Sequence, residues 1–181
     1  MTLNRPGLYK YAAVIPLHAG RAFRLLLCGT LLLVMAGCVP ICGIGAKLTL
    51  SNAHVDSTHT CPNPSSSRPY DVHGTIDVNN YTNNNVTIKS MSETNTNTAA
   101  HGSWSGAVGT KASSDIKNFE PKSIGAGNTA TLRFSIGFVC SNSGPTQETY
   151  GDFSFKFKVV TSSGTYNLDS TDTHRLQIQT G

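Results

Sequence analysis

The sequence predicts an all-β domain, an antiparallel sandwich of about seven strands that begins at residue 47. From that residue onward, apolar and polar side chains alternate in short segments, as they do along strands with one buried face. Gly, Asn, Ser and Pro cluster between these segments and mark turns. No stretch has the apolar spacing of an amphipathic helix, so two antiparallel sheets packed face to face are expected.

The first predicted strands lie between residues 47 and 91. A strand over 47–55 precedes one over 70–81, where apolar or small residues on one face alternate with Asp, His and Thr on the other. The inward positions of this second strand are Val72, Gly74, Ile76 and Val78. The asparagine-rich residues 79–85 predict a turn, and 86–91 resume with apolar side chains on one face. We therefore expect a hairpin.

Residues 92–117 interrupt this pattern. They are rich in Ser, Thr, Asn and Gly, and few apolar side chains occur at alternating positions. Because such a composition buries little apolar surface, we expect a long mobile excursion with one strand at most.

The clearest alternation lies in the C-terminal part of the chain. A turn at 125–128 precedes a strand over 129–140, and a strand over 153–159 directs three Phe side chains inward and two lysines outward, where charge discourages edge pairing. Short strands around 166–168 and 174–179 complete the domain. The inward positions of the 129–140 strand are Ala130, Leu132, Phe134, Ile136, Phe138 and Cys140.

The N-terminal segment has the layout of an export signal. Residues 1–24 contain four basic residues and no acidic one, and residues 25–37 form a short uncharged apolar run. The last three residues of this run and the cysteine that follows, Met35-Ala36-Gly37-Cys38, resemble the lipobox of bacterial lipoproteins, with Met in place of the usual Leu. This resemblance implies that residues 1–37 are a signal peptide, that Cys38 carries lipid, and that 38–46 are a tether for the 47–181 domain. The domain would then be lipid-anchored to the cell membrane or outer membrane.

Two alternatives remain for this segment. The uncharged residues 25–46 are long enough to cross the roughly 30 Å hydrocarbon core as an uncleaved helix, although Pro40 and several glycines weaken that helix. Ordinary signal cleavage near Ala46 is the other alternative. In all three cases the basic residues stay on the cytoplasmic side, so the 47–181 domain faces the extracytoplasmic side.

The charge distribution argues against nucleic acid as a partner. The formal net charge of +4 comes from 14 basic and 10 acidic residues, and the four basic residues Arg5, Lys10, Arg21 and Arg24 all precede residue 25. The domain itself therefore has as many acidic as basic residues. It lacks the positive excess that binding to a polyanion requires.

The cysteines predict one disulfide. Cys28 would leave with the signal and Cys38 would carry lipid, so Cys42, Cys61 and Cys140 remain. We expect Cys61 to pair with Cys140, because both lie within the folded part and an oxidising compartment permits the bond. A bond between Cys42 and Cys61 is the alternative.

The runs GTIDVNN, NNNVTI and IGAGNTATLRFSIGF, followed by two closing strands, resemble the immunoglobulin-like sandwiches of bacterial envelope proteins. The resemblance covers about residues 47–181 and implies an immunoglobulin-like β-sandwich. Two departures limit it: Trp104 does not lie on a clear strand between the cysteines, and Phe138 stands where a tyrosine corner would have Tyr. The resemblance therefore implies architecture and assigns no functional residue.

No motif for catalysis or for a cofactor is present. The segment HGSWSG places Trp104 where a nucleophile elbow needs Ser, and only His101 is near in sequence as a base. We therefore expect a protein that is not an enzyme and holds no cofactor. We expect its role to be protein or polysaccharide binding, adhesion or structural support at the cell envelope.

Two binding features qualify as candidates. Trp104, in a loop of small residues, is a candidate anchor for a partner, with capping of the core as its alternative. The segment HVDSTHTC offers His54 and His59, which suit zinc or copper. An envelope metal-binding protein that uses these two histidines is therefore the alternative function.

Overall fold

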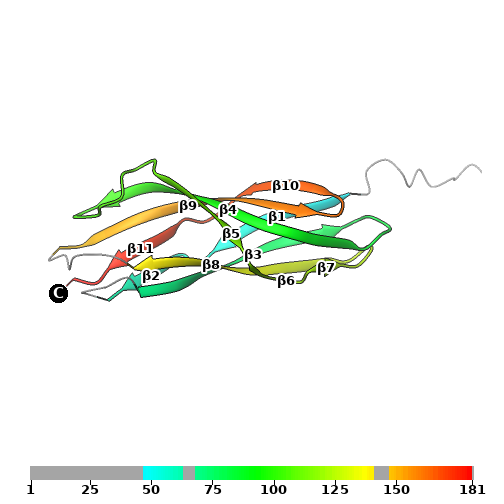
Figure 1. Ribbon diagram of the computed structural model, residues 1–181, viewed down its shortest axis with the longest axis horizontal. Coiled ribbons are helices and arrows are strands. Elements are labelled where there is room, and N and C mark those ends of the chain that lie inside the picture. The colour runs from blue at the N-terminus through cyan, green and yellow to red at the C-terminus, as the bar shows by residue number, and fades with distance from the viewer. Residues whose placement is uncertain (1–46, 63–67, 141–146, 181) are drawn as a thin grey trace, which may run out of the picture. The chain divides into compact units, whose positions relative to one another are not determined.

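The computed structural model describes residues 47–62, 68–140 and 147–180, and these residues form eleven strands and no helix (Figure 1). The strands are β1 (Leu48–Val55), β2 (Thr58–Cys61), β3 (Arg68–Asn80), β4 (Val86–His101), β5 (Lys111–Ile116), β6 (Asn118–Glu120), β7 (Ser123–Ile124), β8 (Thr129–Cys140), β9 (Thr149–Thr161), β10 (Gly164–Asp169) and β11 (His174–Ile178). The predicted all-β, immunoglobulin-like sandwich is confirmed. The strands outnumber the predicted seven because several short edge strands lack a recognisable alternation.

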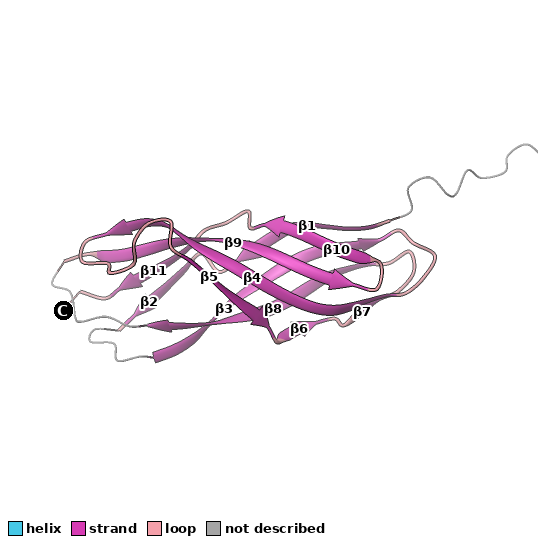
Figure 2. Ribbon diagram, turned by 45° about the horizontal axis from the view of Figure 1, so that its top comes forward, coloured by secondary structure: helices cyan, strands magenta, loops and turns pink. Residues whose placement is uncertain are grey.

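The strands form two sheets. One has four strands in the order β1-β3-β8-β6, and the other has the order β2-β11-β9-β4-β5, with β10 paired to β9 and β7 paired to β4. In Figure 1, β9 and β4 cross one layer while β3 and β8 lie in the other, and the turned view of Figure 2 separates the same two layers. All pairings between named strands are antiparallel except that of β11 with β2, which is parallel.

The chain passes from one sheet to the other along both sides of the sandwich. On one side, β1 belongs to the four-stranded sheet and the next strand, β2, pairs with β11 of the larger sheet. On the other side, β5 pairs with β4, β6 crosses to β8, and β7 returns to β4. Short strands thus lie along the edges of both sheets, an arrangement that limits strand pairing with other chains.

The core lies between the two sheets and contains the apolar faces that the alternation predicts. Leu132 in β8 and Phe157 in β9 are fully buried, and the Phe134 and Phe157 rings meet edge to face at 4.9 Å between centroids. The buried apolar side chains of β3 are Val72, Ile76 and Val78. Each fully buried side chain of this size contributes about 1.5–3 kcal/mol, so this shared interior is what holds the sheets together.

The predicted hairpin between residues 70–81 and 86–91 is wrong. β3 pairs with β1 and β8, whereas β4 pairs with β9, β5 and β7 of the other sheet. The turn between β3 and β4 therefore connects the two layers. Buried Asn80 holds this turn, because its side-chain NH₂ donates to the backbone carbonyls of Asn84, Ile124 and Gly125.

The long excursion predicted for residues 92–117 is also wrong. β4 continues to His101 and pairs with β9 on one side, and β5 (Lys111–Ile116) pairs with it on the other. The buried positions of β4 in this part are Met91, Glu93, Asn95 and Asn97. Buried and less buried positions therefore alternate along this part of β4. The sequence does not show this alternation, because three of the four buried residues are polar. Lys156 and Lys158, which we expected to discourage edge pairing, project outward from β9, but β9 lies inside its sheet.

The N-terminal predictions concern residues outside the described part of the chain. They are the signal peptide (1–37), lipidation of Cys38, the tether (38–46) and the fate of Cys42. Within the described residues there is no helix that is both apolar enough and long enough to cross a membrane.

Candidate functional site

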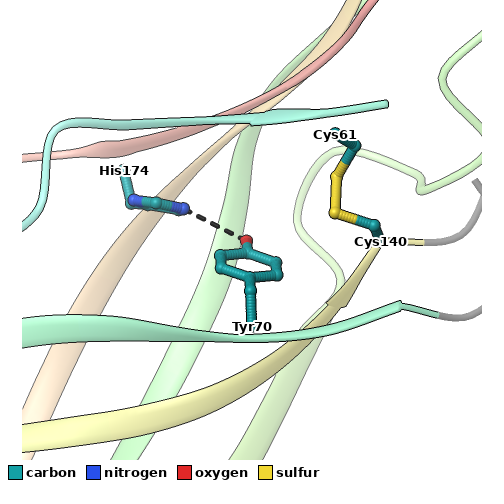
Figure 3. The surroundings of a disulfide bond; sticks show 4 residues. All are labelled: Cys61, Tyr70, Cys140 and His174. Atoms are coloured by element: carbon teal, nitrogen blue, oxygen red, sulfur yellow. Dashed lines mark hydrogen bonds between the residues drawn. A yellow bond between two sulfur atoms is a disulfide. The ribbon is translucent and has the colours of Figure 1, made fainter. Parts of the chain in front are cut away.

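One end of the sandwich is closed by the predicted disulfide, which is confirmed. Cys61 at the end of β2 bonds to Cys140 at the end of β8, with a Cα–Cα distance of 5.7 Å, so the bond joins the two sheets (Figure 3). Both cysteines are buried. The bond closes a loop with a sequence separation of 79. In the chain-entropy model such a loop contributes about 4–5 kcal/mol at most.

A histidine–tyrosine pair lies next to this disulfide (Figure 3). His174 of β11 is 1% exposed, and its Nδ1–H donates to the Asp56 carbonyl at 2.6 Å. The other ring nitrogen, Nε2, therefore accepts the hydroxyl hydrogen of Tyr70 at 3.2 Å. Burial lowers the pKa of His174, against the effect of the Asp56 hydrogen bond, and burial raises the pKa of Tyr70. Both groups are thus held neutral, and the hydrogen bonds fix one histidine tautomer.

His59, one of the two predicted metal ligands, packs against this pair. Its ring stacks on Tyr70 with centroids 3.8 Å apart and planes 7° from parallel. A ligand atom of His59 also lies within 4.8 Å of the sulfurs of Cys61 and Cys140. Those sulfurs are bonded to each other and are not thiolates, the form in which cysteine binds metals. While the disulfide is formed, His59 therefore packs against Tyr70.

His54, the other predicted ligand, lies in different surroundings. It projects from β1 with 55% of its side chain exposed, and its Nδ1 lies 2.6 Å from a carboxylate oxygen of Asp172. The chain passes to the other sheet between His54 and His59, so the structure does not bring these two histidines into one ligand cluster among the described residues. The histidine that lines the same hollow as His54 is His73 of β3.

Trp104 packs on the outer part of the disulfide end. Its indole is half-buried, contacts Phe153 edge to face at 6.0 Å between ring centroids, and covers Gly151 of β9 so closely that a methyl group there would overlap it. Its Nε1 is buried and has no hydrogen-bond partner in the described residues. This packing matches the core-capping alternative, and the anchor role stays a prediction.

The loop that carries Trp104 is held by buried Asn97. The Asn97 side chain donates to the carbonyls of Gly106 at 2.9 Å and Ala107 at 3.2 Å. Ser103 Oγ bonds to Thr149, and the His101 ring stacks on Tyr150. Among the described residues no hydrogen bond links Ser103 to His101, so a nucleophile and its base are not assembled here.

Glu93 is a buried carboxyl group that the alternation of apolar residues does not predict. Its side chain is 3% exposed, with Ser114 Oγ donating at 2.9 Å and the Asn95 amide donating at 3.3 Å. Burial raises the pKa of this carboxyl, although both hydrogen bonds act in the opposite direction. Only a strand over 91–97 with polar residues at its inward positions would predict this burial.

A surface hollow of about 510 Å³ lies along β6. We call it the β6 groove; its charged or titratable lining residues are His73, Lys117, Glu120, Lys122 and Arg133. Lys122 lies 3.1 Å from the centre of the Phe119 ring, and neither Lys122 nor Arg133 forms an ion pair with any residue that the structure describes. The groove therefore offers cations to a partner.

No protein-family model matches this chain, and no curated protein matches it. Among solved structures, it is similar to the sporulation control protein Spo0M of Bacillus subtilis, with 14% identity, TM-score 0.36, and coverage of 76% of this chain and 51% of Spo0M. It is similar to the PapD-like domain 7 of human CEP192, with 9% identity, TM-score 0.26, and coverage of 75% of this chain and 86% of that domain. It is also similar to the CooA pilin subunit of enterotoxigenic Escherichia coli, with 10% identity, TM-score 0.31, and coverage of 72% of this chain and 99% of CooA. The chain thus spans about half the length of Spo0M.

Proposed function

We propose that this chain is a non-catalytic lipoprotein of the cell envelope whose sandwich binds a protein or a polysaccharide outside the cytoplasm. The observation that carries the proposal is the buried Cys61–Cys140 bond between the sheets. Such disulfides persist in oxidising compartments, which agrees with the export signal expected at the N-terminus. A rigid, crosslinked scaffold that displays loops and grooves is suited to binding.

The β6 groove supports the binding part of the proposal. Its exposed cations Lys122 and Arg133 share the groove with the hydrogen-bonding side chains of Asn118 and Ser135, and Lys122 lies over the Phe119 ring. Cations without an ion-pair partner favour an anionic group on the ligand, such as a carboxylate of an acidic sugar or of a protein.

Intact mass spectrometry of the membrane fraction tests the anchoring. We expect a chain that begins at Cys38, carries diacylglycerol there, and has the mass of one disulfide. Cys38→Ser should abolish lipidation, and the matched control Cys42→Ser should retain it. A full-length chain that begins at Met1 and is dissolved in the cytosol would overturn the proposal.

Co-sedimentation with insoluble cell-wall polysaccharide tests the binding. We expect Lys122→Gln combined with Arg133→Gln to reduce co-sedimentation, whereas Lys156→Gln combined with Lys158→Gln, on the outer face of β9, should not. Equal co-sedimentation of both double variants would exclude the β6 groove as the polysaccharide site.

A further inference from the structure

Two exposed histidines lie diagonally across neighbouring strands of the four-stranded sheet. β1 and β3 are antiparallel, with His54 opposite Thr75 and Val55 opposite Gly74. The backbone N–H of Asp56 donates to the His73 carbonyl, so the pairing continues with Asp56 opposite His73. His54 and His73 therefore project from the same outer face as diagonal neighbours, a separation that long side chains can bridge.

Both histidines line one hollow of about 300 Å³. Their side chains are 55% and 69% exposed, so a small ion can reach them from solvent. The charged residues at this place are Asp56, which lines the hollow, Asp172, which contacts His54, and Arg133, which also lines it. Two carboxylates against one guanidinium leave a local charge that favours a cation.

A carboxylate holds the Nδ1 atom of each ring. His54 Nδ1 lies 2.6 Å from Asp172, and His73 Nδ1 lies 3.2 Å from Asp56. Ionised carboxylates only accept hydrogen bonds, so Nδ1 carries the hydrogen in both neutral rings. Thr171 agrees with this assignment for His54: its hydroxyl donates to the Ala53 carbonyl and so accepts from Nδ1, at 2.9 Å.

Among the residues that the structure describes, no hydrogen bond engages Nε2 of either ring, so the Nε2 lone pairs can bind an ion. A histidine that donates its other N–H to a carboxylate is the usual arrangement of a metal ligand, because the carboxylate fixes the tautomer and makes the coordinating nitrogen more basic. Imidazole nitrogens suit zinc and copper, and an open site completes its coordination with water.

We propose that His54 and His73 bind a divalent zinc or copper ion through their Nε2 atoms, with Asp172 and Asp56 as positioning residues. The site differs from the pair His54 and His59 because His59 belongs to β2 and its ring stacks on Tyr70 next to the disulfide. The proposal goes beyond envelope binding and does not depend on lipidation. His73 and Arg133 also line the β6 groove, so the metal site lies next to that groove.

Isothermal titration of the full chain in detergent with Zn²⁺, and separately with Cu²⁺, tests the site. We expect one ion per chain and a loss of affinity of about tenfold or more in His54→Ala and in His73→Ala. Asp172→Asn, which keeps both ligands, should weaken binding less. His59→Ala and the exposed His101→Ala are the matched controls and should bind as the unaltered chain does.

A second readout locates the ion. Cu²⁺ should broaden amide resonances of β1 and β3 around His54 and His73 in the unaltered chain and leave them sharp in the double variant His54→Ala with His73→Ala. Absence of any binding, full binding by the double variant, or a loss confined to His59→Ala would each overturn the proposal.

Discussion

The Tyr70 hydroxyl donates a hydrogen bond to Nε2 of buried His174 at 3.2 Å, and so joins β3 of one sheet to β11 of the other. The same imidazole donates from Nδ1 to the Asp56 carbonyl. Both hydrogen bonds therefore form only while the imidazole ring is neutral. Protonation would place a hydrogen on Nε2, against the Tyr70 donor, and a charge in a site that burial already disfavours.

Acidification should destabilise the fold through His174. Its pKa is lowered by burial from the ordinary 6.5, so the unfolded chain binds a proton that the folded chain resists. The contribution to the free energy of unfolding is complete above pH 6.5 and is lost as the pH falls from 6.5 through the lower folded value. Urea unfolding at a series of pH values measures this slope.

His174→Gln is the variant that tests the source of the slope. It removes the titration, so its free energy of unfolding should be lower at neutral pH but flatter toward acid than that of the unaltered chain. His101→Gln, at an exposed position in β4, is the control and should keep the original slope. If His174→Gln keeps the original pH dependence of the free energy of unfolding, another titratable group causes that dependence.

Replacement of Glu93 by Gln should stabilise the protein at neutral pH. Burial raises the pKa of this carboxyl above its ordinary 4.5, so the folded state favours the protonated form. That stabilising contribution is present below pH 4.5 and is lost as the pH rises through the folded value. A neutral amide avoids the loss, so Glu93→Gln should gain roughly 1 kcal/mol at neutral pH.

The gain from Glu93→Gln should vanish in acid, where the unaltered carboxyl is itself neutral. Thermal unfolding by circular dichroism at neutral and acidic pH measures both values. Glu120→Gln, at an exposed position of β6, should change little at either pH. A loss of stability in Glu93→Gln at neutral pH would mean that the Ser114 and Asn95 hydrogen bonds need the charged form.

The sequence predicts strands well where inward positions are apolar, as in β3, β8 and β9. It fails in β4, because Glu93, Asn95 and Asn97 are buried although they are polar. Glu93 accepts hydrogen bonds from Ser114 and Asn95, and the Asn97 side-chain NH₂ donates to loop carbonyls. Only the folded neighbours reveal that compensation. The alternation of apolar and polar residues therefore identifies a strand only when its buried side chains are apolar.

The candidate site shows the same limit. His54 and His59 are close in sequence, but the passage from β1 to β2 sends them to different sheets. His73 is near His54 because of strand register, which a single sequence does not provide. The Cys61–Cys140 bond was predictable because counting the cysteines left few partners and the strand pattern directed Cys140 inward.

Removal of the disulfide should cost at most about 4–5 kcal/mol of unfolding free energy, the value expected from loop closure. The double variant Cys61→Ser with Cys140→Ser measures it by urea unfolding. Cys42→Ser should leave the stability unchanged, because the bond that joins the sheets does not use Cys42. A loss of stability in Cys42→Ser would indicate a second role for that cysteine.

A methyl group at Gly151 should displace the Trp104 indole. Gly151→Ala would place its Cβ against the indole ring and the Nε1 atom, whereas Gly137→Ala in β8 has no atom within 4 Å of the added Cβ. Overpacking of this kind costs about 1–3 kcal/mol, and we expect that loss in Gly151→Ala only. Displacement into water should also shift the fluorescence of Trp104, the single tryptophan of the chain, to longer wavelength. If Gly151→Ala leaves both stability and emission unchanged, the indole does not rest on β9 in solution, and Trp104 would be free to act as an anchor for a partner.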